Sequence, residues 1–395
     1  MIKIFETGDL HLGMKYQDRN KHPNGAELAE RRYTALAGMV QKANEESCDL
    51  FVVTGDLFDC QDLKRITGKA VARTADILAG FSGEAVLVLP GNHDWYSTDS
   101  QHENVLWDRF RDRCENSNVV VLTAFAPYHF EVGEESVDVY PAFCNSRTAV
   151  DNNLDWIRAC EMPQDGSYRI GIAHGAVRGK TIDNEGVYFL MSENELNEIP
   201  VDVWLLGHTH VMFPEGLDKE YRTGGKIFNA GTHVQDHVGR KTEGYSIILE
   251  LEKQGAEPAT VRAKQVLSGN TFFRRMEIRV SPEGRTGTGD ELRKSILKET
   301  APLDRTNTSL SLIISGTVTQ EELDKREYIY QDCLEGFLEC PCPKDDRLVK
   351  LVTEEMIDRQ YTPDSFPSRL LKELLDRPAA LQLAAELMDK MKEEN

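Results

Sequence analysis

Short apolar runs and helical patterns alternate over the first two thirds of the chain. The spacing predicts strands at 2–7, 50–54, 85–89, 119–122, 169–173 and 201–206, and helices at 27–46, 64–80, 104–113 and 151–160. This alternation favours a layered α/β fold, because each helix must bury its apolar face on a sheet. Three further strands are expected at 226–229, 245–252 and 259–266, with no helix between them. We expect this late cluster to form a second sheet.

Length and turn signals indicate more than one domain. At ~100–200 residues per domain, a chain of 395 residues suggests two or three domains. Residues 267–271 read Leu-Ser-Gly-Asn-Thr, which is typical of a connection between domains. We therefore expect a first domain over 1–268, a small α/β cap domain over 269–345 and a helical C-terminal tail over 346–395. In the small domain, Thr319 and Glu322 have the spacing of a helix capping box.

The last helical pattern of the tail carries an apolar stripe. It consists of Leu381, Leu383, Ala384, Leu387, Met388 and Met391. Apolar residues at this spacing lie near one face of a helix, and that face needs to be covered. The sequence leaves two coverings open: the stripe packs on its own domain, or it docks a partner protein.

The net charge of the chain is −20, from 46 Lys and Arg against 66 Asp and Glu. Non-specific affinity for nucleic acid comes largely from basic side chains that neutralise phosphates. This balance argues against a chain that grips DNA tightly by itself. The N-terminal residues lack an apolar signal segment, no apolar run is long enough to span a membrane, and the eight cysteines are scattered. We expect a cytoplasmic protein with reduced thiols.

Five short segments place His, Asp or Asn beside Gly directly after an expected strand. They are Gly8-Asp9-Leu10-His11, Gly55-Asp56-Leu57-Phe58-Asp59, Gly91-Asn92-His93-Asp94, Ala173-His174-Gly175 and Gly207-His208-Thr209-His210. Loops that leave the carboxyl ends of strands are where α/β sheets bind ligands. A single segment of this kind is more often an ordinary turn, but five in this order indicate one shared site.

Seven side chains in these segments offer oxygen or imidazole ligands: Asp9, His11, Asp56, Asn92, His174, His208 and His210. Carboxylate, imidazole and amide oxygen without thiolate suit Mn, Fe, Zn or Ni rather than a structural zinc site. Seven candidates exceed what one ion needs once water is included, so we expect two divalent ions, with Asp56 able to bridge them. Two ions ~3.5–4 Å apart clamp the oxygens of a phosphoryl displacement and activate the attacking water.

The series Asp-x-His, Gly-Asp-x-x-Asp, Gly-Asn-His-Asp, His and Gly-His-x-His resembles the calcineurin-like metallophosphoesterase superfamily. This resemblance implies a two-sheet sandwich flanked by helices, with a dinuclear site at the loops. It also implies two ligand sets that share one carboxylate. One ion would take Asp9, His11, Asp56 and His210, and the other would take Asp56, Asn92, His174 and His208.

The same resemblance assigns catalytic roles to two residues that are not ligands. His93 would be the proton donor or the stabiliser of the transition state. Asp59 stands where phosphatases of the superfamily carry an aspartate that orients this histidine, whereas some nuclease members carry a histidine there. A carboxylate in that place would fix the histidine tautomer and favour the imidazolium form.

The motifs Asp-Leu-His-Leu-Gly at 9–13, Gly-Asp-Leu-Phe-Asp at 55–59 and Gly-Asn-His-Asp at 91–94 resemble the SbcD/YhaO-type DNA repair nuclease family. The likeness is specific over 1–210, looser to 268 and weak beyond. It implies a Mn-dependent exonuclease or endonuclease subunit that acts on DNA in repair and recombination. An SbcC-like coiled-coil ATPase would be its partner, and formation of a homodimer is left open.

Gly231-Thr232-His233 stands where nuclease members of the superfamily usually carry Pro-Gly-Ser. This departure and the acidic charge keep a second hypothesis open: a phosphatase or cyclic-nucleotide phosphodiesterase of the same superfamily, acting on a small or protein substrate. His233 itself would add a hydrogen bond to the site or lie in a surface turn.

Residues beside the motifs add candidates for substrate contacts. Trp95 and Tyr96 directly follow Gly-Asn-His-Asp and would stack on a base or pack within their own loop. Arg178 and Lys180 follow His174 and would hold a phosphate or lie in a solvated loop. The sequence does not decide between these alternatives.

Overall fold

The computed structural model describes residues 1–18, 21–163, 165–180, 186–239, 242–281, 290–341, 343 and 346–393. The chain divides into two compact units: the first comprises 1–17 and 25–272, and the second comprises 18–24 and 273–395. The first unit is therefore discontinuous in the sequence, because the segment 18–24 belongs to the second unit. The three-part division into 1–268, 269–345 and 346–395 stays a prediction.

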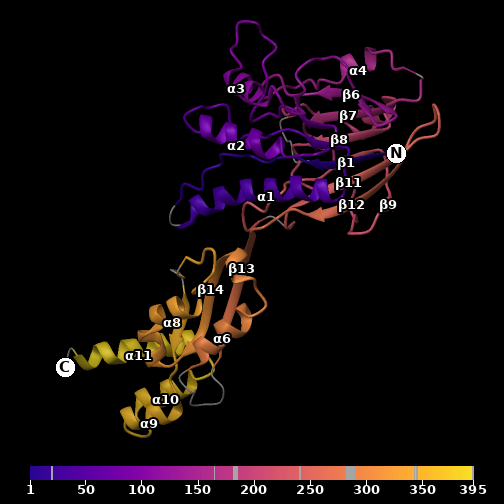
Figure 1. Cartoon of the computed structure of the whole chain (residues 1–395). Coiled ribbons are helices and arrows are strands. Elements are labelled where there is room, and N and C mark those ends of the chain that lie inside the picture. Colours follow the sequence, from indigo (N-terminus) through magenta and orange to yellow (C-terminus); the bar gives the residue numbers. More distant parts are fainter. Residues whose placement is uncertain are drawn as a thin grey trace. The chain divides into compact units, whose positions relative to one another are not determined.

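A seven-stranded sheet forms one half of the first unit (Figure 1), in the order β4-β3-β2-β1-β11-β12-β9. Its strands are β1 (Ile2–Thr7), β2 (Leu50–Val53), β3 (Ala85–Val88), β4 (Val119–Val121), β9 (Arg222–Thr223), β11 (Tyr245–Glu252) and β12 (Thr260–Leu267). Strands β1 to β4 run parallel. β11 is antiparallel to β1 and to β12, and β9 is antiparallel to β12.

A five-stranded sheet forms the other half, in the order β10-β8-β7-β6-β5. Its strands are β5 (Tyr128–Val132), β6 (Glu135–Ala142), β7 (Tyr168–His174), β8 (Val203–Gly207) and β10 (Ile227–Asn229). Strands β6, β7, β8 and β10 run parallel, and β5 is antiparallel to β6. The β5–β6 hairpin is not among the strands predicted from the sequence.

The expectation that the three late strands form a second sheet is wrong for two of them. β11 and β12 complete the first sheet, and only β10 joins the second. The reason lies in β11, where the consecutive residues Ile247, Ile248 and Leu249 are all fully buried. A strand that is apolar on both faces fits the interior of a sheet covered on both sides, and β11 lies there between β1 and β12.

Alternate side chains of the first sheet face two different cores, as the period of two in a strand requires. One set packs against the second sheet: Ile2, Ile4, Leu50, Val52 and Leu87 contact a core that includes Val139, Ile170 and Leu205. The other set packs against helices: Phe5, Phe51, Val53 and Val86 share a core with Leu36, Val71 and Phe110. The first sheet is therefore buried on both faces.

Helices cover the outer faces of both sheets. The first sheet carries α1 (Gly25–Glu45), α2 (Gly68–Leu78) and α3 (Val105–Cys114), which lie together in Figure 1. The outer face of the second sheet packs with residues of α4 (Asp155–Ala159) and α5 (Glu193–Glu198). The predicted two-sheet sandwich flanked by helices is confirmed. In the described part of the chain, we find no helix with the length and apolar character that crossing a membrane would demand.

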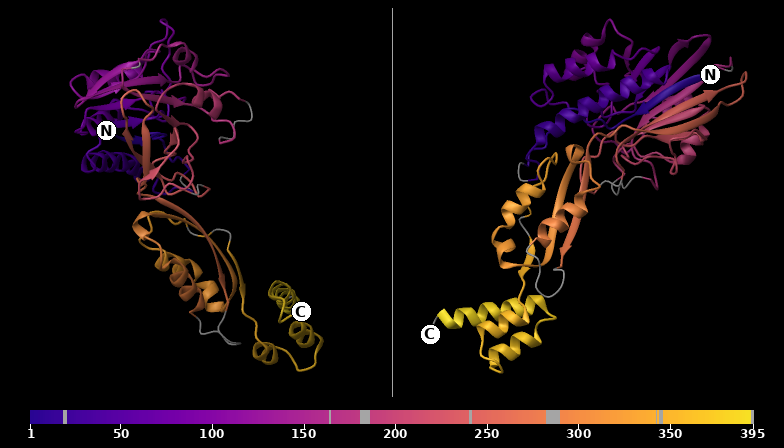
Figure 2. Two further views of the ribbon diagram at one scale, coloured as in Figure 1. Left: turned by 90° about the vertical axis from the view of Figure 1, so that its right-hand side faces the viewer. Right: turned by 60° about the horizontal axis from the view of Figure 1, so that its bottom comes forward.

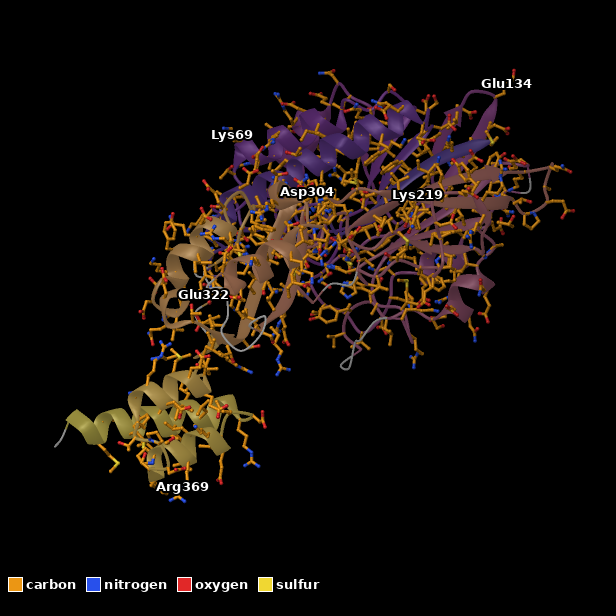
Figure 3. All side chains as sticks on the ribbon, turned by 90° about the horizontal axis from the view of Figure 1, so that it is seen from below. Lys69, Glu134, Lys219, Asp304, Glu322 and Arg369 are labelled. Atoms are coloured by element: carbon orange, nitrogen blue, oxygen red, sulfur yellow. The ribbon has the colours of Figure 1, made fainter. Side chains whose placement is uncertain are left out.

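The second unit contains a three-stranded sheet of order β13-β14-β15. Its elements are β13 (Phe272–Val280), α6 (Glu291–Thr300), the 3₁₀ helix η1 (Arg305–Asn307), β14 (Thr308–Val318), α7 (Gln320–Asp324), α8 (Arg326–Cys333) and β15 (Arg347–Lys350). The capping box predicted at the start of α7 is confirmed, with Thr319 and Glu322 bonded reciprocally. Glu322 (Figure 3) also accepts a hydrogen bond of 2.9 Å from the Leu292 amide, so it ties α7 to α6.

Three helices follow in the tail: α9 (Glu354–Gln360), α10 (Phe366–Glu373) and α11 (Pro378–Glu393), coloured yellow in Figure 2. The apolar stripe of α11 is partly buried and partly exposed to solvent. Leu381 is buried with Ile357 and Leu371. Leu383, Leu387 and Met391 are 60%, 54% and 63% exposed. These three side chains, spaced four residues apart, form what we call the α11 ridge.

Candidate metal centre

The motif segments lie at the carboxyl ends of parallel strands in both sheets. Asp9, Asp56 and Asn92 follow β1, β2 and β3, which are neighbours in the first sheet. His174 ends β7, and His208 follows β8 beside it in the second sheet. Parallel strands end at the same edge of their sheet, so each sheet presents its motif residues together. The contacts given below join all seven candidate ligands and His93 in one cluster.

The first group of ligands lies around His210. The Nε2 atom of His11 is 3.2 Å from Nε2 of His210 and 3.6 Å from Oδ2 of Asp56. Oδ1 of Asp9 is 3.6 Å from the same nitrogen of His210. Asp9, His11 and His210 each offer a ligand atom within 4.8 Å of the others. Together with Asp56 they are the set that the family resemblance assigns to one ion.

The second group lies around Asn92. Its Oδ1 atom is 3.1 Å from Nε2 of His174 and 3.0 Å from Nδ1 of His208. Oδ2 of Asp56 is 3.5 Å from the same nitrogen of His174. One carboxylate oxygen of Asp56 therefore lies within 3.6 Å of a histidine from each group. That is where a ligand shared by two ions would lie.

The donor atoms of the cluster fit divalent ions. The His11 and His210 nitrogens that face each other are both atoms that can bind a metal ion, and the His11 side chain is buried. Nδ1 of His11 is buried with no hydrogen-bond partner among the described residues. Oxygen and imidazole donors without thiolate are the set that Mn, Fe, Zn and Ni accept. The residues present therefore suit two such ions.

Burial keeps two of the histidines in the neutral form that binds metals. It lowers the pKa of the His11 imidazole well below its ordinary value. Burial, together with the neighbouring His174, also lowers the pKa of His208 to about 3. At neutral pH both rings carry free lone pairs, and a metal ion does not have to displace a proton from either of them.

Asp56 and His174 form the opposite case. Burial alone would raise the pKa of Asp56, but His174 holds the pKa of this carboxyl well below its usual range. Burial lowers the pKa of His174, yet the Asp56 carboxylate more than offsets this effect and raises it to about 9. Without metal the two side chains form a buried ion pair. An ion that takes both as ligands therefore displaces the His174 proton.

Five of the seven candidate ligands have a backbone conformation that side chains rarely adopt. The φ angles are 52° for Asp9, 43° for His11, 52° for Asp56, 91° for His208 and 52° for His210. Non-glycine residues enter this left-handed region at a free-energy cost, and such residues gather at functional sites. Backbone hydrogen bonds from Asp9 to Gly55 (3.1 Å) and from His11 to Asp56 (2.9 Å) hold two of the strained turns together.

Two glycines let the loops of the two sheets approach closely. Gly55 has a φ of 106°, and a Cβ atom on it would lie 2.0 Å from Nδ1 of His174. A Cβ atom on Gly207 would lie 2.0 Å from the carbonyl oxygen of Thr54. Neither distance is sterically allowed, so a side chain at these positions would push the second sheet's histidines away from the first sheet's carboxylates.

His93 is anchored on both sides of the cluster. Its backbone amide donates to Oδ1 of Asp56 at 2.8 Å, and its ring packs edge-on against His11 with centroids 4.6 Å apart. Its Nδ1 atom is 3.0 Å from the backbone carbonyl of Asp59. The Asp59 carboxylate is instead paired with Arg65 and lies 3.8 Å from His11. The orienting role expected of this carboxylate stays a prediction.

Sequence reasoning missed residues that position the motif loops. Arg32 of α1 is buried and donates to the Leu10 carbonyl at 2.8 Å, so it fixes the loop that carries Asp9 and His11. The Asp94 carboxylate accepts from the amides of Phe58 (2.9 Å) and Gly91 (2.7 Å) and joins the loops after β2 and β3. Arginine side chains on helices are usually exposed to solvent. The only sequence signal for the buried role of Arg32 is its position beside the apolar face of α1.

The candidates for substrate contacts beside the motifs have different surroundings. Tyr96 packs against Phe143. The Arg111 guanidinium lies over the Tyr96 ring, 4.9 Å from the ring centroid. Lys180 pairs with Glu193 at 3.3 Å, whereas Trp95 lines a cavity beside His93.

His233 does not lie in a surface turn, because its side chain is fully buried. Neither ring nitrogen has a hydrogen-bond partner in the described part of the chain, so the structure does not provide the expected bond to the site either. Thr232 beside it donates to the Asp9 carbonyl at 3.4 Å, which connects the Gly-Thr-His stretch to the first motif.

The family of the chain follows from a comparison over most of the first unit. A family model described as "Calcineurin-like phosphoesterase" matches residues 2–212, which is more than half of the chain and includes every candidate ligand. The chain belongs to the calcineurin-like phosphoesterase family. It is therefore a metal-binding hydrolase of phosphoesters, and the clustered residues are candidates for the dinuclear site of that family.

Solved structures similar to the chain include TT1561 of Thermus thermophilus, with 13% identity, a TM-score of 0.37, and coverage of 65% of this chain and 99% of that one. The purple acid phosphatase PPD1 from yellow lupin (Lupinus luteus) seeds matches with 13% identity and a TM-score of 0.38, over 67% of this chain and 53% of that one. A dimetal phosphatase from Danio rerio matches with 11% identity and a TM-score of 0.36, over 66% and 98%.

Replacement of Asp56 tests the shared ligand. In Asp56→Ala, both groups of ligands lose a carboxylate oxygen, so we expect metal content to fall from two ions per chain to none. The measurement is elemental analysis after loading with Mn and desalting. Asp112→Ala, which removes an exposed acid of α3, is the control and should keep two ions. Two ions in Asp56→Ala would show that Asp56 does not bridge.

Gly55→Ala tests the close approach of the two sheets. The added Cβ atom must displace His174, so we expect Mn affinity to fall ~10–100-fold, as for loss of a residue that orients a ligand. Gly38→Ala is the matched control, because a Cβ there meets nothing within 4 Å in the interior of α1. It should stabilise the protein by about 0.5–1 kcal/mol. Calorimetric Mn titration and urea unfolding separate the two effects, and unchanged Mn affinity in Gly55→Ala would contradict the packing argument.

Proposed function

We propose that the chain is a Mn-dependent phosphodiesterase of the SbcD type: a cytoplasmic DNA exonuclease or endonuclease subunit that acts in DNA repair. The observation that carries the proposal is the complete cluster of seven candidate ligands with His93 beside it. The motif resemblance at 9–13, 55–59 and 91–94 supports the choice of a nuclease within the family.

The chain's own residues suit hydrolysis of a phosphodiester. When bound, two divalent ions supply charge that holds the scissile phosphate and lowers the pKa of an attacking water. Nδ1 of His93 lies at hydrogen-bond distance from the Asp59 carbonyl, which can only accept, so Nε2 is the ring nitrogen that remains for the reacting group. In the imidazolium form of His93, the proton on Nε2 would pass to the leaving oxygen, or Nε2–H would donate a hydrogen bond to it in the transition state.

A phosphatase or cyclic-nucleotide phosphodiesterase is the second candidate function. It is favoured by the net charge of −20, since a small substrate needs no basic track. The Gly231-Thr232-His233 stretch, which departs from the nuclease pattern, lies against the loop of Asp9 and favours it as well. Both functions use the same ligand cluster and differ in substrate.

We further propose that an SbcC-like coiled-coil ATPase binds the tail through the α11 ridge. Leu383, Leu387 and Met391 expose apolar side chains at a spacing of four residues, which matches one face of a helix. An apolar stripe of this kind suits a helix of a partner laid along it. The partner would also supply the basic surface that the acidic chain lacks.

Removal of the His93 side chain tests the catalytic assignment. His93→Ala should lower Mn-dependent cleavage of linear double-stranded and single-stranded DNA by ~10²–10⁴-fold, because a positioned proton donor contributes about that much. Mn content should stay at two ions per chain. His129→Ala, which removes an exposed histidine of β5, is the control.

Two outcomes would overturn the nuclease proposal. One is the absence of DNA cleavage by the wild-type chain with and without the partner ATPase. The other is turnover of cyclic nucleotides or p-nitrophenyl phosphate esters far above that of DNA, which would establish the second candidate instead.

Leu387→Glu tests the ridge. This side chain is exposed, so the variant should fold like the wild type within about 0.5 kcal/mol, yet it should lose co-purification with the coiled-coil ATPase. Glu355→Gln, an exposed change on α9, is the control for the tail. Unchanged co-purification of Leu387→Glu would exclude the ridge as the contact.

A further inference from the structure

A cavity of about 510 Å³ lies directly beside His93. Asp59, Gln61, Arg65, Trp95 and Arg147 line it together with His93. The cavity therefore shares one wall with the metal cluster, because His93 contacts both His11 and the Asp56 carboxylate. A group held in this cavity would be connected to the phosphate that the ions hold.

Two guanidinium groups give the cavity a positive balance in an acidic chain. Arg65 pairs with Asp59, so the Asp59 carboxylate neutralises one of the two charges. The Nε atom of Arg65 is nevertheless buried with no hydrogen-bond partner among the described residues. Arg147 is exposed and forms no ion pair within the described ranges of the chain. One positive charge next to His93 is therefore uncompensated.

The backbone on both sides of Arg147 is fixed. The Cys144 amide donates to the Pro90 carbonyl at 3.1 Å, which ties the loop to the segment before Asn92. On the other side, the Ala149 amide donates to the Val187 carbonyl at 2.8 Å. Between these anchors the loop presents Arg147 to the cavity. An arginine whose neighbouring backbone is anchored loses less backbone entropy when it binds an anion than one on a free loop.

An aromatic surface completes the cavity. Trp95 stands on the loop that follows His93, and its ring lies 4.8 Å from that of His102. Its carbonyl accepts from the Gln61 side chain, so the backbone of Trp95 is held in place. The cavity thus combines a planar cation that suits phosphate, an indole ring that suits a nucleobase, and a shared wall with the reacting centre.

We propose that this cavity is a subsite for the nucleotide next to the scissile bond, in which Arg147 binds the phosphate one nucleotide away and Trp95 stacks on the base. The proposal rests on the proposed phosphodiesterase function and deepens it, because it names the residues that would bind the neighbouring nucleotide of the DNA strand. A substrate with a single phosphate, such as a cyclic nucleotide or a simple monoester, has nothing to offer Arg147.

The test compares two ligands that differ by one phosphate. Thymidine dinucleotide with only its internal phosphodiester is compared with the same dinucleotide carrying a further phosphate at its 5′ or 3′ end, each as an inhibitor of bis-p-nitrophenyl phosphate hydrolysis with Mn. The wild type should bind the form with two phosphates about tenfold more tightly, a typical effect of one charge-assisted contact. In Arg147→Ala this ratio should fall to about one, and in Arg147→Lys it should be intermediate.

Arg109→Ala is the matched control, because Arg109 is an exposed arginine of α3 outside the cavity, and it should keep the wild-type ratio. A wild-type ratio near one, or the same ratio in Arg147→Ala as in the wild type, would overturn the subsite. If the wild type hydrolyses no phosphodiester, the proposed function fails by itself. The ratio is then measured by calorimetric binding of the two dinucleotides, so the subsite is still decided separately.

Discussion

The buried carboxylate of Asp56 is the group on which the arrangement of the site depends. One of its oxygens lies 3.6 Å from a nitrogen of His11 and 3.5 Å from a nitrogen of His174. These histidines come from different sheets, so Asp56 joins the two halves of the sandwich at their common edge. A buried charge is unfavourable unless it is paired. The proton on His174, or divalent ions in its place, supply that pairing, and metal binding is therefore linked to the stability of the first unit.

The turns that carry the ligands are strained, and the fold compensates for this. Asp9, Asp56 and His210 adopt positive φ angles that Asp or His residues enter only rarely. Hydrogen bonds between neighbouring loops and the buried arginine Arg32 hold the loops of Asp9 and Asp56 in place. The glycine at 55 leaves out a side chain that would press against His174 beside Asp56. Strain of this kind is typical of functional sites, where the surrounding structure holds side chains in place.

The strands and the site residues could be predicted because both have local signals. Apolar runs such as 50–54 indicate buried strands, and the candidate site residues are the polar residues that directly follow these runs in the sequence. The β5–β6 hairpin was missed because neither strand is an uninterrupted apolar run: β5 alternates half-buried and exposed residues, and β6 contains Asp138 and Pro141. The pairing of β11 with β1 joins residues some 245 positions apart, and no local pattern encodes that choice of partner. The roles of Arg32 and Arg65 could not be predicted for a similar reason, since they depend on tertiary contacts.

The acidic charge of the chain limits how it can bind a long polyanion. Affinity for a long polyanion scales with the number of phosphates that basic side chains neutralise, and a chain of charge −20 has few to spare. Many of its exposed arginines are already engaged with acids, as Arg73 is with Glu30 and Arg113 with Asp76. With two divalent ions bound, positive charge would instead be concentrated at the metal cluster and at Arg147, which lines the cavity beside His93. If the chain acts on DNA as proposed, binding would depend on the few nucleotides at the reacting centre, and affinity for longer DNA would come from another protein.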